Sequence, residues 1–205
     1  GKLRPALGDP KSLQPGAMIS VQLLSGDLSV AADGTVTHVD GNQVYAFGHR
    51  LLSLGDTEIP FARSEVLTLV PNLSSSFKIS VPREWMGTIT TDGSTAVAGE
   101  LGRRAGMIPF SIAVTSHGAG SGPANSQIYK MEMVNDGVLS PLLVQMALSS
   151  TLEATQRALG NATLAVRGEI QFEKNAAPIR LNNTYSGDAG LSQIASLSAA
   201  SSLAR

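Results

Sequence analysis

His49 is the residue of this chain whose position best suits chemistry. It closes the segment GTVTHVDGNQVYAFGH, residues 34–49, in which two runs typical of β-strands flank an Asp-Gly-Asn turn. A histidine at the end of a strand is anchored on one side and open on the other, and its imidazole exchanges protons near neutral pH. Gly48 has no Cβ, so a substrate can approach the ring closely. The pattern therefore favours His49 as a general base.

The same position also fits a structural histidine, whose ring nitrogens are satisfied by local hydrogen bonds. If His49 is a base, its ring should be exposed at a concave surface, with one nitrogen held by a carboxylate or a carbonyl and the other open. His38 lies inside the hairpin and is expected to form a cross-strand pair. His117 lies in a Gly/Ser-rich loop and is expected to be solvated.

A carboxylate often orients a catalytic imidazole. Asp27, Asp40 and Asp92 each sit beside a glycine, where aspartate favours turn geometry. Of the three, Asp27 is the candidate orienting group for His49, because it precedes the strand that is expected to pair with the hairpin. No histidine–carboxylate cluster has metal-ligand spacing, and the chain has no cysteine for a disulfide, a thiolate or a metal–sulfur site. We expect neither a metal nor any other cofactor.

Three segments carry a resemblance to known proteins: PGAMISVQLLSGDLSVAADGTVTHVDGNQVYAFGH at 15–49, TLVPNLSSSFKIS at 68–80 and GTITTDGSTAVAGELG at 87–102. They resemble the SpoIVB family of bacterial serine peptidases, and more closely the large exported bacterial proteins that carry this domain. The resemblance spans residues 15–102, and its most specific part is the GTVT…AFGH pattern. It implies that His49 is the catalytic base of a serine endopeptidase. Arg50 stands where many relatives have proline.

The nucleophile that this resemblance implies is missing from the sequence. In the family it lies in a Gly-Ser-Gly-Ser-Pro type of segment with an aspartate before it; the nearest serines here, at 74–76 and 121, lack that pattern. Serine hydrolysis requires a hydroxyl within reach of the base and an oxyanion hole. We therefore expect the chain to be inactive alone. Its expected partners are the serine-bearing half of the parent protein and a peptide or protein substrate.

The composition also allows a non-enzymatic interpretation, a β-rich binding or scaffold module of a large exported bacterial protein. Charged residues make up 15% of the chain, so Ser, Thr, Asn, Gln and Gly must cover much of the surface. The net charge of −1, without a basic stripe, argues against nucleic acid as a partner. No stretch is apolar enough to span a membrane. The resemblance implies an exported or cell-envelope location in a bacterium.

The residue patterns predict a mainly β fold with α additions. We expect a β-barrel or sandwich core, for which a trypsin-like barrel is one form, together with one main helix and a C-terminal helix. Residues 1–14 are predicted to be a linker and 186–205 a helical tail. Residues 15–185 between them form the predicted β-rich domain, with a sub-boundary near 116–125.

Helical spacing of apolar residues predicts the main helix over residues 139–159. Ser140 as N-cap and Pro141 at the first position are expected to begin it. Asp92-Gly93 predicts a second β-hairpin, besides the one that leads to His49.

Overall fold

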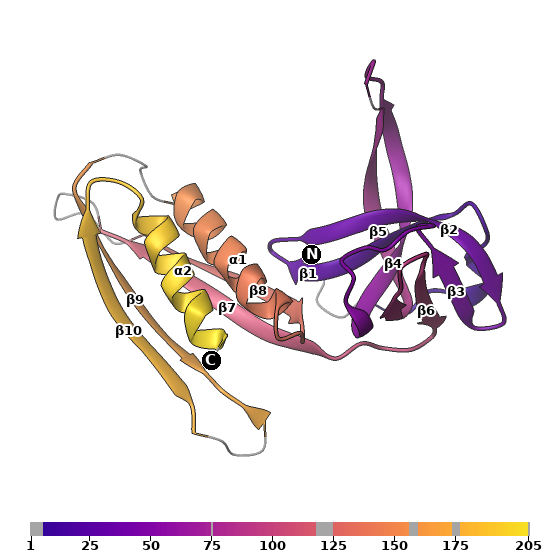
Figure 1. Ribbon diagram of the computed structural model, residues 1–205. Helices are drawn as coiled ribbons and strands as arrows, with labels where there is room; N and C mark the ends of the chain where they lie inside the picture. Colours follow the sequence, from indigo (N-terminus) through magenta and orange to yellow (C-terminus); the bar gives the residue numbers. More distant parts are fainter. Residues whose placement is uncertain (1–5, 75, 118–124, 156–159, 174–176, 205) are drawn as a thin grey trace. The chain divides into compact units, whose positions relative to one another are not determined.

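The computed structural model describes residues 6–74, 76–117, 125–155, 160–173 and 177–204. These residues form ten β-strands and two α-helices (Figure 1), which confirms the predicted mainly β fold with helical additions. The chain divides into two compact units. The first comprises residues 1–109 and 131–135, and the second comprises 110–130 and 136–205.

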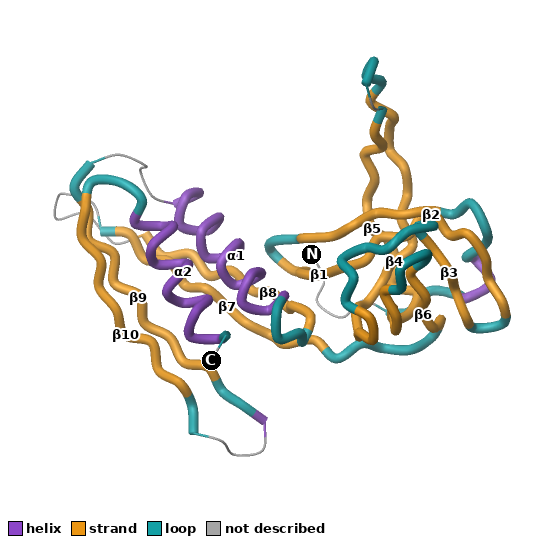
Figure 2. Tube along the Cα trace, in the orientation of Figure 1, coloured by secondary structure: helices purple, strands orange, loops and turns teal. Residues whose placement is uncertain are grey.

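The first unit consists mainly of strands, and both α-helices belong to the second unit (Figure 2). The first unit contains a 3₁₀ helix, Pro10–Ser12, and the strands β1 (Met18–Gly26), β2 (Val30–Asp40), β3 (Gln43–Ala46), β4 (Gly55–Val70), β5 (Phe77–Asp92) and β6 (Val97–Leu101). Two strands, β7 (Met107–Ser116) and β8 (Asn125–Val134), contribute residues to both units. The second unit also contains α1 (Leu139–Thr155), β9 (Ala162–Ile170), β10 (Ile179–Gly187) and α2 (Leu191–Leu203).

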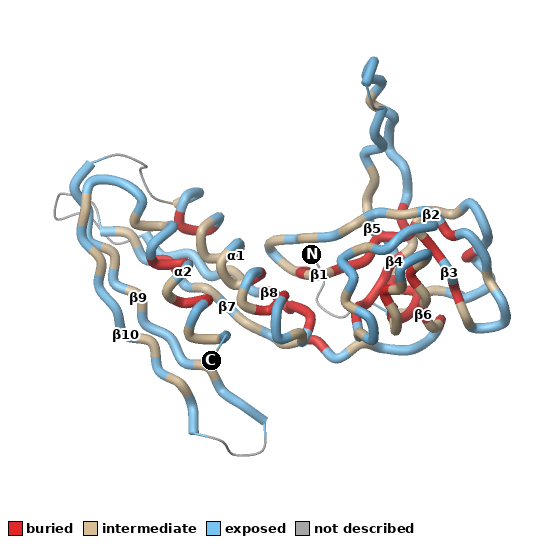
Figure 3. Tube along the Cα trace, viewed as in Figure 1, coloured by how far each residue is buried: buried red, intermediate tan, exposed pale blue. Residues whose placement is uncertain are grey.

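Antiparallel pairing closes six strands of the first unit into a ring, in the order β1-β2-β3-β6-β5-β4 and back to β1. The ring closes because β1 uses both of its edges. One edge pairs with β2, and the other pairs with β4 through residues 18–21 and with β8 through residues 24–26. Buried positions lie along these strands (Figure 3). The core that they form includes the apolar side chains of Ile19, Val21, Val44, Phe61, Met86 and Ile89. This ring is the barrel-like part of the fold.

Beyond the ring, β4 and β5 continue as a two-stranded arm, residues 65–70 and 77–81 (Figure 1). The pairing runs from Glu65 opposite Val81 to Val70 opposite Phe77. Much of the arm is exposed (Figure 3). Its large exposed apolar residues are Val66, Leu67, Leu69, Phe77 and Ile79. The strands that build the core therefore also present an apolar surface.

Part of the segment predicted as a linker is packed against the first unit. Gly8 donates its N–H to the Trp85 carbonyl at 2.7 Å, and Leu13 is buried. Asp9 caps the 3₁₀ helix by accepting the N–H of Lys11 at 2.9 Å. The described residues of this segment, 6–14, are thus held by hydrogen bonds and burial.

In the second unit, α1 and α2 pack against each other, and α2 also packs against β9 and β10. Its core contains Val114, Leu152 and Ala195, with Tyr129 and Leu164 among the side chains packed around them. The C-terminal helix, expected within a tail at 186–205, is part of this unit. Neither α-helix is long and apolar enough to cross a membrane, nor is any other helix in the described part of the chain.

The predicted start of α1 at Ser140 and Pro141 is wrong, because the helix begins at Leu139 and Pro141 is its third residue. Asp136, not Ser140, is the N-cap: its Oδ1 accepts the N–H groups of Val138 at 2.9 Å and Leu139 at 2.8 Å. Ser140 reaches back instead, and its Oγ accepts the Asp136 N–H at 3.1 Å. The Asp136 side chain thus satisfies two donors of the first turn, and the Ser140 side chain satisfies the donor of Asp136, in the manner of a capping box. The helix extends to Thr155, and the rest of its predicted range lies outside the described residues.

Candidate functional site

His49 lies where the chain leaves the β2–β3 hairpin. At this point the backbone N–H of Phe47 donates to the Thr35 carbonyl of β2 at 2.9 Å. Phe47 and Gly48 then each adopt a φ of 71°. This left-handed conformation suits glycine and strains phenylalanine, and it turns the chain away from β2. His49 follows this turn and is exposed at the surface.

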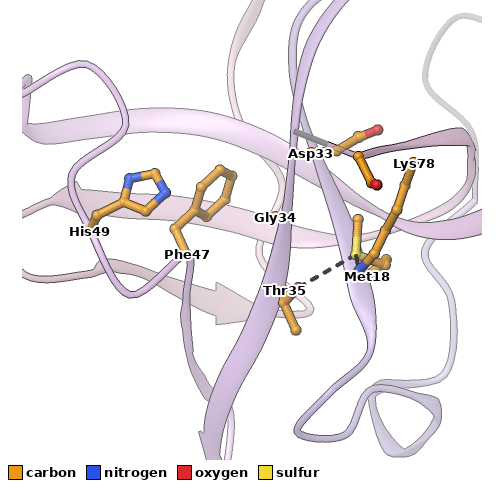
Figure 4. Close-up of a pocket in the computed structure, with 8 residues that line it drawn as sticks. Met18, Asp33, Gly34, Thr35, Phe47, His49 and Lys78 are labelled. Carbon is orange, nitrogen blue, oxygen red and sulfur yellow. Dashed lines mark hydrogen bonds between the residues drawn. The ribbon is translucent and has the colours of Figure 1, made fainter. Parts of the chain in front are cut away.

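A pocket of about 380 Å³ lies beside this turn (Figure 4). Its lining comes entirely from the first unit and comprises Met18, Asp33, Gly34, Thr35, Phe47, His49, Ser76 and Lys78. Phe47 lies between His49 and the strand that carries Gly34 (Figure 4). A Cβ on Gly34 would meet the Phe47 ring at 2.6 Å, so this ring packs directly on the glycine. The ring also stands edge-on to the His49 imidazole, with centroids 5.8 Å apart. Gly34 therefore makes room for the aromatic contact that supports His49.

One ring nitrogen of His49 is bound within the chain. Nδ1 lies 2.6 Å from the carbonyl oxygen of Arg50. Because a carbonyl can only accept a hydrogen bond, Nδ1 carries the ring hydrogen and is the donor. In the neutral imidazole, Nε2 then presents its lone pair. Among the described residues, Nε2 has no hydrogen-bond partner. This exposed ring, with one nitrogen held and the other open, is the arrangement that we expected of a general base.

The structure does not bring Asp27 to His49. Asp27 lies in the turn between β1 and β2, next to the pair of Leu24 with Val30. His49 lies at the opposite end of this strand pair, near Thr35, which is five residues beyond Val30 and about 17 Å away along β2. The carbonyl of Arg50 occupies the orienting position that we had predicted for Asp27.

Asp33 and Lys78 bring opposite charges to the pocket. The carboxylate of Asp33 accepts a hydrogen bond from the Ser80 hydroxyl. Lys78 Nζ lies 3.6 Å from Met18 Sδ, a weak acceptor, and has no carboxylate partner among the described residues. The pocket therefore offers a cation that an acidic ligand group can pair with.

Asp92 holds the loop that follows His49. Its carboxylate accepts backbone N–H groups from Leu51 at 2.7 Å, Leu52 at 2.6 Å and Leu54 at 3.2 Å. Burial pushes the pKa of the Asp92 carboxyl up, but the N–H groups of Leu51, Leu52, Leu54 and Ser53 outweigh burial and leave this pKa below its ordinary value of 3.8. The sequence suggested only a turn at Asp92. The loop N–H groups required an acceptor, but no pattern identified which residue supplies it.

The serines considered from the sequence do not complete a catalytic pair. Ser76 lines the pocket, but its Oγ accepts the Asn72 N–H at 3.3 Å. Ser74 donates its N–H to the Asn72 side chain at 2.8 Å. No serine in the described part of the chain is hydrogen-bonded to His49, and Ser75 and Ser121 lie outside that part.

The other two histidines make no site with His49. His38 stacks on its cross-strand neighbour Tyr45, with centroids 6.3 Å apart, as predicted, and His117 is exposed. Within the described residues, no group of three or more His, Asp or Glu side chains is placed to hold a metal ion. Comparisons of the chain with protein-family models, with curated proteins and with solved structures found no match.

Proposed function

We propose that this chain carries the general-base half of a serine-endopeptidase site, with His49 as the base and the serine on another segment of the parent protein. The observation that carries the proposal is the hydrogen bond from Nδ1 of His49 to the Arg50 carbonyl, at 2.6 Å. It leaves Nε2 open at an exposed pocket. The likeness of residues 15–102 to SpoIVB peptidases supports the same role and an exported bacterial location.

In the proposed reaction His49 first accepts a proton from the serine and then donates a proton to the leaving amine. A serine hydroxyl entering the pocket gives its proton to Nε2 as its oxygen attacks a peptide carbonyl. Nδ1 keeps its bond to the Arg50 carbonyl, whose dipole stabilises the imidazolium that forms. The imidazolium then protonates the leaving amine, and the neutral ring activates the water that hydrolyses the acyl-enzyme. The oxyanion hole is expected on the segment that carries the serine.

The test is casein hydrolysis by the full-length protein that contains this chain. We expect His49→Ala to lower kcat/KM at least about 100-fold, because the base is lost. His117→Ala is the matched control, since His117 is exposed and does not line the pocket, and it should keep full activity. The 205-residue chain alone should not hydrolyse casein. Full activity in His49→Ala, or hydrolysis by the chain alone, overturns the proposal.

A second function is favoured by the arm of β4 and β5. Leu67, Leu69 and Phe77 are 56%, 57% and 55% exposed, and grouped apolar side chains of this kind are typical of contact surfaces between proteins. A non-enzymatic binding module of an exported protein accounts for this surface and needs no serine. The two functions respond to different substitutions: a binding module loses its partner in Phe77→Ser and keeps it in His49→Ala.

A further inference from the structure

One edge of β2 pairs with β3 and then loses its strand partner beside the pocket. Val36 turns its N–H and C=O toward the β1 edge, where both bond to residues 16–17 at 2.8 Å. Thr35 therefore faces the opposite edge, and its carbonyl accepts the N–H of Phe47. After this hydrogen bond the chain turns at Gly48, which has a φ of 71°.

Beyond this point the edge of β2 has no strand partner among the described residues. Backbone groups alternate along an antiparallel strand, so Ala31 and Asp33 point their N–H and C=O to the same side as Thr35. Residues 30–34 pair with β1 on their other side, and no strand in the described part of the chain pairs with them on this one. An unpaired edge with aligned donors and acceptors is a template for one more strand.

We propose that residues 30–34 of β2 bind an extended peptide as an added antiparallel strand and that this peptide is the substrate presented to His49. The peptide-binding site is inferred from the unpaired edge of residues 30–34, whereas the role of the peptide as substrate rests on the proposed peptidase function. The added strand lies along the same edge of β2 as β3, runs in the same direction as β3 and begins where the chain turns away after Phe47. Its N-terminal end therefore lies at the turn that carries His49.

Lys78 gives this peptide a charge preference. It lines the same pocket as Asp33 and Gly34, two residues of the free stretch of β2. Among the described residues Lys78 has no carboxylate partner, and its Nζ contacts only the weak acceptor Met18 Sδ, so its ammonium is available to a ligand. An acidic side chain at the N-terminal end of the added strand pairs with it. The substrate class is thus an extended peptide with Glu or Asp near that end.

The first test measures binding to the 205-residue chain by fluorescence anisotropy. The probe is the fluorescein-labelled peptide Glu-Val-Thr-Val-Thr-Val. Two further peptides carry N-methyl groups on alternate amides, one peptide on the odd-numbered amides and the other on the even-numbered amides. We expect the peptide whose methyl groups face β2 to bind at least tenfold more weakly than the parent peptide. The other methylated peptide should bind within threefold of the parent peptide. Replacing the peptide's Glu by Lys should weaken binding at least threefold, and Lys78→Glu should reverse this preference.

The second test changes the edge itself. Ala31→Pro removes the N–H that faces the peptide and leaves the bonds of Ala32 and Gly34 to β1, so binding should fall at least tenfold. Ala31→Thr, the matched control, keeps the N–H and should bind within twofold. If Ala31→Pro unfolds, amide exchange in the unchanged chain decides: the peptide should slow exchange at Ala31 and Asp33 at least tenfold and leave Ala32 and Gly34 unchanged. Absence of peptide binding, or unchanged exchange at Ala31 and Asp33, overturns the strand site.

Binding and catalysis fail separately in these experiments. Peptide binding at residues 30–34 without hydrolysis dependent on His49 supports the strand site and overturns the proposed peptidase function. Hydrolysis dependent on His49 without peptide protection of residues 30–34 overturns the strand site alone.

Discussion

Asp92 accepts the backbone N–H of Leu51 at 2.7 Å, and this bond ties the end of β5 to the loop that follows His49. The carboxylate is buried, with 3% of the residue exposed, so backbone dipoles rather than water balance its charge. The same side chain also binds Leu52 and Leu54. A residue from a distant strand therefore fixes the loop on which the candidate base depends.

We expect Asp92→Asn to lower the free energy of unfolding of the first unit by about 2–4 kcal/mol. Asparagine offers one acceptor oxygen, and its NH2 group would be buried among N–H donors. Urea unfolding followed by the fluorescence of Trp85, the one tryptophan of the chain, measures the effect. Asp40→Asn, at the exposed last residue of β2, is the control and should change stability by less than about 0.5 kcal/mol. Equal stability of the two variants would show that the loop does not need the carboxylate.

Acid should weaken the same unit through Asp92. The pKa of this carboxyl lies below 3.8 in the folded chain, so the folded state binds the proton less tightly than the unfolded state does. Its stabilisation is complete above the unfolded pKa and is lost as the pH falls through the folded pKa. The urea midpoint should therefore fall more between about pH 5 and pH 3 in the wild type than in Asp92→Asn. Glu84, whose pKa is lowered by its hydrogen bond to Arg63, is common to both chains. Parallel pH profiles would contradict the prediction.

Gly34→Ala should destabilise the first unit by about 1–3 kcal/mol, because the new methyl group collides with the Phe47 ring. The cost should be smaller when Phe47 is already alanine, and a double-mutant cycle in urea measures the coupling. Gly106→Ala serves as the control, since a Cβ there meets nothing within 4 Å. Additive effects of the two substitutions would mean that the ring does not pack on Gly34.

In the second unit, Asp136→Ala should cost about 1 kcal/mol, because two N–H groups at the start of α1 lose their acceptor. Thermal unfolding followed by far-UV circular dichroism measures this loss. Ser150→Ala, on the exposed side of α1, should be neutral or slightly stabilising. A larger loss from Ser140→Ala than from Asp136→Ala would return the N-cap to the serine predicted from the sequence.

The hairpins could be predicted because turn chemistry and strand chemistry coincide in the sequence. Asp40 and Gly41 separate two β-branched or aromatic runs, and Asp92-Gly93 does the same for β5 and β6. The closure of the ring could not be predicted. Alternation assigns side chains to faces but does not say that β1 pairs with β2, β4 and β8.

The candidate site could be predicted only in part, because local residue types identify His49 but not the groups that hold it. His49 is visible from its residue type and from Gly48 beside it. Its orienting partner is the carbonyl of Arg50, a group that every residue has, so no side-chain pattern marks it. Asp92 was hidden because its contacts with the loop cross from one strand to a distant segment, while its neighbour Gly93 suggested only a turn.

The most direct test of the central claim is labelling of the full-length protein with a fluorophosphonate, which reacts with a serine only when a base activates it. We predict that the label is found on a serine outside these 205 residues. Its rate of labelling should fall at least about 100-fold in His49→Ala and stay unchanged in His117→Ala. Labelling of Ser76 or another serine of this chain, or an unchanged rate in His49→Ala, would contradict the assignment of His49 as the base for a serine supplied from elsewhere.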